Sequence, residues 1–322
     1  MDLTAILAPV ADEMHRVDEA IRGSLSSDVA LVSQLSHYII NSGGKRLRPV
    51  VVLMAARAGG YQGGHHIDMA AVIEFIHTAT LLHDDVVDGS EMRRGLNTAN
   101  AIWGNEASVL VGDFLYSRAF QMMVGVGSLE IMSIMADATN TIAAGEVMQL
   151  MHVHDPDTSE ASYLEVIQRK TATLFQAGAR VGAALSGMPE ELKDAVGRYG
   201  LHLGNAFQLV DDLLDYSGSV EAIGKNIGDD LAEGKATLPL IRALGQGDRD
   251  QRELIRSAIE HGGLDNLHEV VSAVESTGAI EYTSRLARSE ADGAIEAIRE
   301  LPDSAFRESL IRLADFCVER SY

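Results

Sequence analysis

Apolar residues recur along the chain at the period of an α-helix. They return every three to four positions over long stretches, a pattern typical of helices that bury one face against a core. Gly and Pro clusters, such as Gly187-Met188-Pro189, separate these stretches and mark helix ends. The pattern predicts helices over residues 67–88, 106–125, 128–152, 159–186, 191–216, 237–245, 250–261, 264–277, 279–300 and 303–320.

The first 60 residues continue this pattern. It predicts an opening helix with Leu3, Ile6, Leu7 and Val10 on one face, a second over 29–40 that stops at Asn41-Ser42-Gly43-Gly44, and a third from Val50 to Ala56. No stretch shows a convincing strand alternation, although Val50–Leu53 resembles a short one. No linker rich in Pro, Gly or Ser divides the chain, so we expect one all-α domain over residues 1–322. The segment most like a domain boundary, Ser217–Lys235, is interpreted as an active-site loop.

The chain is strongly acidic, with 47 Asp and Glu against 26 Lys and Arg and a formal net charge of −21. This balance argues against non-specific nucleic-acid binding and against docking on an anionic membrane, because both need a basic face. No window holds the ~18 uninterrupted apolar residues of a membrane span. The single cysteine, Cys317, rules out a disulfide within the chain and favours the reducing cytoplasm.

Two of the predicted helices end in the same acidic pattern. Apolar residues lead into Asp84-Asp85-x-x-Asp88 and again into Asp211-Asp212-x-x-Asp215. In each motif the first and last aspartates lie one turn apart on one face, which places like charges side by side. Bound cations remove this conflict, and carboxylate oxygens with room for water and phosphate are what Mg²⁺ prefers. One copy would fit a solvated helix end equally well, but two copies favour a metal site. A calcium loop is disfavoured because neither copy has the Asp-x-Asp-x-Asp-Gly spacing.

Basic residues gather beside the acidic motifs. Lys45, Arg46 and Arg48 follow Gly43-Gly44, and Arg93-Arg94 follows the first acidic motif. Either group alone fits ordinary surface charge. However, Arg and Lys are the usual diphosphate ligands, and a Gly-Gly turn at a helix boundary offers free backbone N–H groups. Basic clusters next to metal-binding carboxylates predict a cavity that seats two diphosphates.

These motifs resemble those of the trans-isoprenyl diphosphate synthase family, and the resemblance covers the whole chain. In family order the chain has Gly-Gly-Lys-Arg-x-Arg-Pro at 43–49, the first acidic motif with Arg-Arg-Gly at 84–95, Gly112-Asp113, Lys170-Thr171, Phe207-Gln208 with the second acidic motif at 207–215, and Gly224-Lys225. Segments 76–83 and 112–123 look particularly like the bacterial octaprenyl diphosphate synthases that make the ubiquinone side chain. The resemblance implies an isoprenoid-synthase-type helical bundle around a central cavity, and a homodimer.

The resemblance also implies a role for each motif residue. Asp84 and Asp88 would hold two Mg²⁺ ions, and Asp211, with Asp215 through water, a third. Asp85 and Asp212 would support these metal shells. The allylic diphosphate would be held by Arg93, Lys170, Lys225 and Lys235, with Thr171 and Gln208 near the forming cation. Isopentenyl diphosphate would be bound by Lys45, Arg48, His77 and Arg94.

The implied reaction joins isopentenyl diphosphate head to tail onto an allylic diphosphate, with farnesyl diphosphate as the expected starter. Metals and cations stabilise the diphosphate that leaves C1. The isopentenyl double bond attacks the allylic cation, and the departing diphosphate removes the proton. Water must be excluded, because it would hydrolyse the cation.

Product length would depend on a tunnel lined by helices. Ala79 and Thr80 lie five and four residues before Asp84, where bulky aromatics close the tunnel in short-chain members of the family. These small residues therefore imply a long product, with octaprenyl favoured and nonaprenyl or a shorter chain as alternatives. Met123 and Met135 are typical core residues that we also expect to influence chain length.

Two other function classes remain open from the sequence. A class I terpene cyclase shares the metal motifs but needs no second diphosphate site, so Lys45, Arg48 and Arg94 speak against it. A non-catalytic subunit of a heteromeric synthase, or a metal-responsive structural protein, is the other alternative. Such regulatory partners usually lack an intact acidic motif, whereas this chain has both.

Overall fold

The computed structural model describes residues 2–41, 43–93, 95–217, 228–262 and 264–319, and helices dominate them. The helices are α1 (Leu3–Leu7), α2 (Ala11–Ser24), α3 (Ala30–Asn41), α4 (Leu47–Ala58), α5 (His65–Val87), α6 (Ala99–Trp103), α7 (Asn105–Val126), α8 (Leu129–His152), α9 (Glu160–Ile167), α10 (Thr173–Leu185), α11 (Glu190–Ser217), α13 (Asp229–Ala232), α14 (Leu238–Gln246), α15 (Arg249–His261), α16 (Leu267–Ser276), α17 (Ala279–Ala297) and α18 (Ala305–Glu319). The all-α prediction is confirmed. None of the described helices is both long and apolar enough to cross a membrane.

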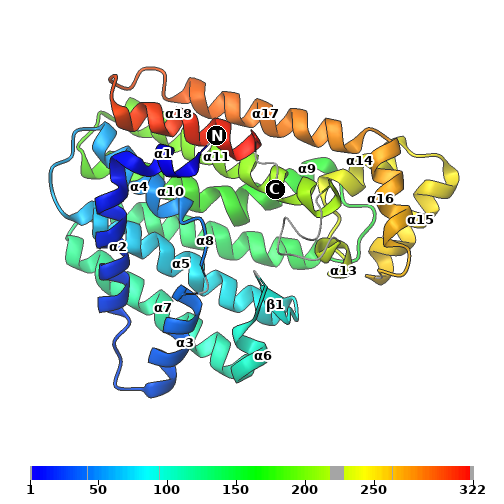
Figure 1. Ribbon diagram of the computed structural model, residues 1–322, viewed down its shortest axis with the longest axis horizontal. Helices are drawn as coiled ribbons and strands as arrows, with labels where there is room; N and C mark the ends of the chain where they lie inside the picture. The colour runs from blue at the N-terminus through cyan, green and yellow to red at the C-terminus, as the bar shows by residue number, and fades with distance from the viewer. Residues whose placement is uncertain (1, 42, 94, 218–227, 263, 320–322) are drawn as a thin grey trace.

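The long helices form a layered bundle (Figure 1). Helices α10 and α11 run through its middle, α17 and α18 lie along one side, and α5, α7 and α8 lie along the other. Helix α11 packs on α10 and α17, α10 packs on α4, and α5 packs on α7. The short helices α13 to α16 cover one end and bury a smaller apolar cluster of their own. The interpretation of residues 1–322 as one domain stays a prediction.

Helix α4 explains the apolar run that resembles a strand. Every side chain from Val50 to Ala56 is fully buried. The helix is enclosed by α5, α10 and α18, so it has no polar face to break the run. This segment is therefore a core helix, as predicted, and Arg48 lies in its first turn.

The predicted helix over 159–186 contains a π-helical turn. Residues Gln168–Ala172 (η2) have this wider winding, between α9 and α10. Single π turns inside α-helices occur often at functional sites, because they change the direction in which neighbouring side chains point. Lys170 and Thr171 both lie in this turn. Apolar periodicity does not reveal it, since the flanking helices keep the ordinary period.

Two elements differ from the sequence-based expectation. Helix α2 was not predicted, because few of its residues are apolar and just Val17 and Ile21 are buried along it. The absence of strands is wrong at one place, where β1 (Met92–Arg93) pairs antiparallel with β2 (Leu96–Asn97). Gly95, with φ of 74°, lies in the connection and permits the tight turn. Arg93 therefore lies on a hairpin and not on a continuation of the preceding helix.

Candidate active site

Both acidic motifs line one cavity of about 530 Å³. Asp84 lies in the last turn of α5 and Asp88 caps that helix, while Asp211 and Asp215 lie in the last turns of α11. All four are among the residues that line the cavity. The structure thus brings together the four aspartates predicted to bind metal, from helices more than 100 residues apart in sequence.

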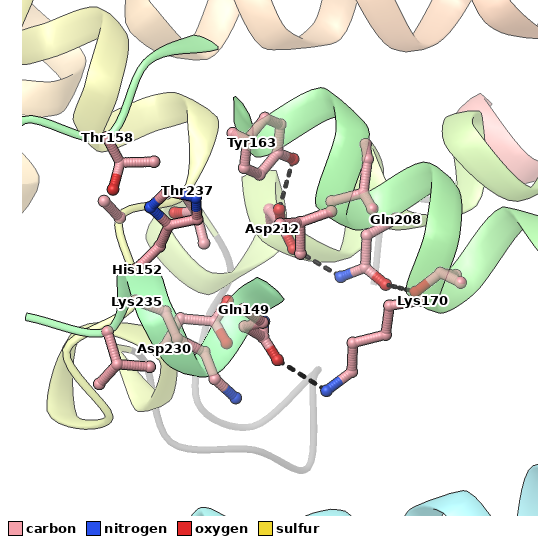
Figure 2. Close-up of a pocket in the computed structure, with 15 residues that line it drawn as sticks. Gln149, His152, Thr158, Tyr163, Lys170, Gln208, Asp212, Asp230, Lys235 and Thr237 are labelled. Carbon is pink, nitrogen blue, oxygen red and sulfur yellow. Dashed lines mark hydrogen bonds between the residues drawn. The ribbon is translucent and has the colours of Figure 1, made fainter. Parts of the chain in front are cut away.

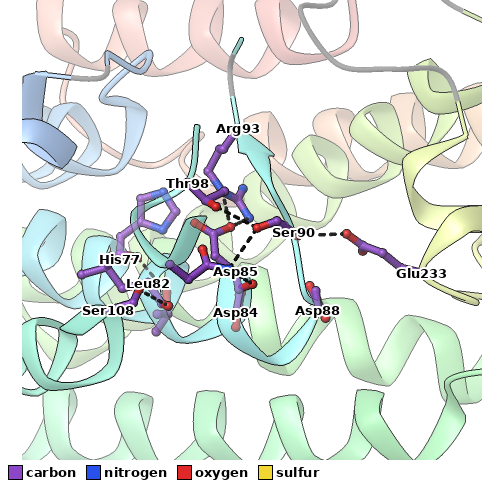
Figure 3. Close-up of polar contacts among 12 residues, drawn as sticks. His77, Leu82, Asp84, Asp85, Asp88, Ser90, Arg93, Thr98, Ser108 and Glu233 are labelled. Atoms are coloured by element: carbon purple, nitrogen blue, oxygen red, sulfur yellow. Dashed lines mark hydrogen bonds and ion pairs between the residues drawn. The ribbon is translucent and has the colours of Figure 1, made fainter. Parts of the chain in front are cut away.

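The middle aspartate of the first motif is buried in a polar network (Figure 3). Asp85 is 4% exposed, and its Oδ1 accepts hydrogen bonds from Nε (2.8 Å) and Nη2 (2.7 Å) of Arg93. Burial raises the pKa of Asp85, and the Arg93 guanidinium opposes this rise. Asn100 of α6 donates to the backbone carbonyls of Asp85 and Ser90 and so ties α6 to the end of α5 and the residues that follow it. Arg93 also lines the cavity, so this pair anchors a cation at its edge.

Lys170 connects the first motif to α8. Its Nζ lies 3.3 Å from Oδ2 of Asp84, 2.6 Å from Oε2 of Glu146 and 2.7 Å from Oε1 of Gln149. Burial raises the pKa of Glu146 to about 7, and the neighbouring Lys170 opposes the rise. The ammonium group of Lys170 is therefore held next to Asp84, the first aspartate of the motif.

Two glycines allow neighbouring helices to approach the π-helical turn. A Cβ on Gly145 of α8 would lie 2.8 Å from Cβ of Arg169 and 2.9 Å from the backbone nitrogen of Lys170. A Cβ on Gly204 of α11 would lie 2.4 Å from Cα of Ala172. Larger side chains at these positions would push the turn away, so the glycines help to keep Lys170 at the cavity.

A chain of hydrogen bonds runs behind the second motif (Figure 2). Tyr163 donates to Oδ2 of Asp212 (2.5 Å), and Nε2 of Gln208 donates to Oδ1 of the same carboxylate (2.7 Å). The hydroxyl of Thr171 donates to Oε1 of Gln208 (2.9 Å). Burial raises the pKa of Asp212 to about 7, while its two hydrogen-bond donors stabilise the carboxylate. Thr171 and Gln208 line the large cavity, as their predicted place near the reacting carbon requires.

Lys235 reaches the first motif from the segment before α14. Its Nζ lies 2.8 Å from Oδ2 of Asp88 and 2.5 Å from Oε2 of Glu233. Burial lowers the pKa of Lys235, but the carboxylates of Glu233 and Asp88 outweigh burial and raise it above the ordinary value. Lys235 is therefore a permanent cation on the cavity wall.

The predicted isopentenyl diphosphate ligands lie at the start of α4 and on α5. Lys45, Arg48 and His77 line the same cavity as the acidic motifs. Nη1 of Arg48 donates to Nε2 of His77 (3.1 Å), and the Arg48 guanidinium lies 4.4 Å from the centre of the Phe175 ring. Arg46, with φ of 51°, pairs with Glu74 at 3.0 Å. Two further predicted ligands, Arg94 and Lys225, lie outside the described residues.

The residues predicted to set chain length lie along α5, α7 and α8. Thr80 lines the cavity, and its hydroxyl donates to the backbone carbonyl of His77. Ala79, Met123 and Met135 are fully buried in the main core. These three are absent from the described residues that line the cavity, so their influence on product length stays a prediction.

Several residues of the site were missed by sequence reasoning. Glu146 and Gln149 share a face of α8 at a spacing of three, a weak signal that common helix surfaces also give. Glu233 gave no signal beyond its charge-rich segment, and Tyr163 gave none. All four were found through their hydrogen bonds and ion pairs with predicted site residues.

The donor set fits a hard cation such as Mg²⁺. Asp84, Asp88, Asp211 and Asp215 offer carboxylate oxygens to the cavity. Among the described residues, no three acidic, His or Cys side chains form a ready-made cage. Mg²⁺ does not need one, because one or two carboxylates usually bind it together with water and substrate phosphates. The arrangement therefore suits ions that arrive with a diphosphate.

Comparison with known proteins gives consistent matches over the whole chain. The family profile described as Polyprenyl synthetase matches residues 29–276. The chain is 53% identical over 321 residues to the octaprenyl diphosphate synthase of Escherichia coli (strain K12), covering 99% of each protein. It is 45% identical over 316 residues to the all-trans-nonaprenyl-diphosphate synthase (geranyl-diphosphate specific) of Rhodobacter capsulatus, covering 98% of this chain and 97% of that protein.

A solved structure extends the match to three dimensions. The polyprenyl synthase from Caulobacter crescentus CB15, complexed with calcium and isoprenyl diphosphate, superposes with a TM-score of 0.96 at 45% identity. The match covers 99% of this chain and 98% of that one. The fold, the paired acidic motifs and these relatives agree, and the chain belongs to the polyprenyl synthetase family as a long-chain trans-prenyltransferase.

Proposed function

We propose that this chain adds successive isopentenyl diphosphate units to farnesyl diphosphate and releases octaprenyl diphosphate for quinone biosynthesis. The observation that carries the proposal is the single cavity lined by both acidic motifs and by two separate groups of cations. The product assignment is supported by the 53% identity to an octaprenyl diphosphate synthase. The small residues at 79 and 80 support a long product over a short one.

Mg²⁺ bound by Asp84, Asp88, Asp211 and Asp215 would neutralise the diphosphate that leaves the allylic substrate, with three ions expected. Lys170, Lys235 and Arg93 would hold the same diphosphate, because each is fixed at the cavity by a carboxylate partner. A cation held in place stabilises developing negative charge without first having to reorganise.

The second substrate would lie between the start of α4 and α5. Lys45 and Arg48 would bind the diphosphate of isopentenyl diphosphate, and His77 would contribute through its hydrogen bond with Arg48. The proposed roles extend to Arg94 and Lys225 by resemblance alone. The isopentenyl double bond would then attack the allylic carbon beside Thr171 and Gln208, and the released diphosphate would take the proton.

The chain would act as a homodimer in the cytoplasm. The proposed dimer is supported by large apolar side chains exposed on α7 and α8, among them Leu110, Val124, Val147, Leu150 and Met151, each at least 60% exposed. Exposed apolar groups on two neighbouring helices are typical of a subunit interface. Sedimentation analysis tests this, with a dimer expected and a monomer as the contrary result.

The proposed function is tested by incubating the purified chain with farnesyl diphosphate, labelled isopentenyl diphosphate and Mg²⁺. We expect a product ladder that ends at eight isoprene units. An end point of nine units would favour the nonaprenyl alternative. A cyclised hydrocarbon without incorporated label would favour a terpene cyclase, and binding without turnover would favour a non-catalytic subunit.

A further inference from the structure

The hydrogen bonds behind the second acidic motif have a fixed direction. In its ionised form Asp212 accepts hydrogen bonds at both oxygens, one from the hydroxyl of Tyr163 and one from the amide nitrogen of Gln208. The amide nitrogen of Gln208 is thereby turned toward Asp212, which leaves its oxygen to face Thr171. Because this oxygen can only accept, the hydroxyl of Thr171 donates its single hydrogen to it.

The consequence is a defined polarity at the cavity wall. The hydroxyl hydrogen of Thr171 points back toward Gln208, so the lone pairs of its oxygen are left for the cavity. Thr171 and Gln208 line the large cavity and also a second cavity of about 130 Å³, which Tyr163 and Asp212 line as well. Lone pairs directed at an allylic carbon favour positive charge there, and a hydroxyl hydrogen in the same place would oppose it.

Tyr163 is the last member of this series of hydrogen bonds, at the end opposite Thr171. It is 5% exposed, Asp212 is 3% exposed and Thr171 is 8% exposed, so little of these side chains is open to bulk solvent. The three residues come from α9, α11 and the π-helical turn, and this turn packs on both α9 and α11. Without the tyrosine hydroxyl, Asp212 would keep one donor and could turn, and Gln208 would lose the anchor that fixes its amide.

We propose that Tyr163 is a positioning residue that sets the hydrogen-bond direction of Thr171 through Asp212 and Gln208. This inference rests on the proposed prenyl-transfer reaction and adds a residue that does not touch either substrate. Tyr163 should therefore influence the rate at which the allylic diphosphate ionises, and it should not influence how tightly either diphosphate binds.

The test compares single condensations of farnesyl diphosphate with labelled isopentenyl diphosphate. Tyr163→Phe removes one buried hydroxyl and should lower kcat by about 10- to 100-fold, as loss of an outer partner of a functional group commonly does. The KM values for both diphosphates should stay unchanged. Tyr199→Phe is the matched control, because Tyr199 is also buried, donates to the backbone carbonyl of Leu310 on α18 and lines neither cavity. It should lose similar thermal stability and retain wild-type kcat.

A double-mutant cycle separates positioning from a general loss of order. Thr171→Val should lower kcat, and adding Tyr163→Phe should lower it no further, because the tyrosine acts through the removed hydroxyl. Two outcomes would overturn the inference. One is wild-type kcat in Tyr163→Phe, and the other is a double variant whose fold-loss in kcat equals the product of the two single losses. If the wild-type chain itself gives no condensation, it is the proposed function that fails.

Asp212→Asn serves as a second variant if Tyr163→Phe does not fold. An asparagine oxygen can accept from Tyr163, but its amide nitrogen then faces Gln208 and forces that amide to turn round. The hydroxyl hydrogen of Thr171 would then point into the cavity. We expect a loss of kcat that higher Mg²⁺ does not restore. Wild-type kcat, or a loss that higher Mg²⁺ restores, would contradict the proposed polarity.

Discussion

Nζ of Lys235 lies 2.8 Å from Oδ2 of Asp88, although 147 positions separate the two residues in the sequence. The contact joins the segment before α14 to the end of α5 and places a cation beside an aspartate predicted to bind metal. Glu233 holds the same ammonium at 2.5 Å. Three charged groups thus meet at one edge of the cavity, where the proposed allylic diphosphate would lie.

Replacing Lys235 should weaken use of the allylic substrate. In Lys235→Gln the diphosphate loses a fixed cation, and Asp88 and Glu233 lose their shared partner. We expect kcat/KM for the allylic diphosphate to fall by about 10²–10³, the range seen when one fixed charge-stabilising group is removed. Lys193→Gln is the control, since Lys193 pairs with Glu130 and Glu190 away from the cavity. Equal kcat/KM in Lys235→Gln and wild type would contradict the role.

Metal binding should depend on diphosphate. The described residues hold no ready-made cage of three ligands, so Mg²⁺ alone should raise Tm little. Mg²⁺ together with inorganic diphosphate should raise Tm by several degrees, because both bind the folded chain. Thermal unfolding with each component alone and with both together checks this. Chelation with EDTA should abolish turnover, and Mg²⁺ should restore it. A full Tm shift with Mg²⁺ alone would show a preformed metal site instead.

The substitution Ala79→Phe tests the tunnel hypothesis. Ala79 is fully buried, one position before the cavity-lining Thr80. An aromatic ring there should close the tunnel and shorten the product by several isoprene units. Overpacking should also cost about 1–3 kcal/mol of stability, so the assay belongs well below the Tm of the variant. Thr80→Val, which keeps the side-chain size, should leave the product ladder unchanged. A wild-type ladder from Ala79→Phe would refute the open tunnel.

The pKa of Glu146 predicts a pH-dependent stability in the metal-free chain. Burial raises this pKa to about 7, above the ordinary value of 4.5. At pH values between these two, the folded state therefore binds more protons than the unfolded state. The contribution of Glu146 to stability therefore falls as pH rises from about 4.5 to above 7. The Glu146→Gln variant has no carboxyl group at this position, so its stability should not fall in this way as the pH rises.

Thermal unfolding in EDTA measures the effect. Relative to wild type, Glu146→Gln should gain several degrees in Tm between pH 5 and pH 8, because each pKa unit corresponds to about 1.4 kcal/mol and each kcal/mol moves Tm by about 2–4 °C in a large domain. The control is Glu165→Gln, which removes an exposed carboxylate paired with Arg169 on α9. Parallel Tm curves for Glu146→Gln and wild type across this range would argue against the raised pKa.

The sequence predicted the long helices because each buries a continuous apolar face. It also predicted which aspartates would line the cavity, because Asp84 and Asp88 share a helix face and so do Asp211 and Asp215. Helix α2 was missed because its apolar face is short, and the hairpin at 92–97 because two paired residues leave no periodic signal.

The partners of the site residues could not be predicted in the same way. Tyr163 meets Asp212 across 49 positions, and Glu146 meets Lys170 through a π-helical turn. Such contacts depend on how helices pack and on where glycines let them approach. A single sequence does not show which helices pack together or which of its glycines lie where two helices meet.

The central claim is that the acidic motifs of α5 and α11 act together on one diphosphate. The most direct test is Mg²⁺-dependent incorporation of labelled isopentenyl diphosphate by Asp84→Asn, by Asp211→Asn and by the double variant. Each single variant should lose at least about 100-fold in kcat, and the double variant should be little worse than the weaker single one, because groups that act as a unit are not additive. Wild-type turnover in either single variant would contradict the claim.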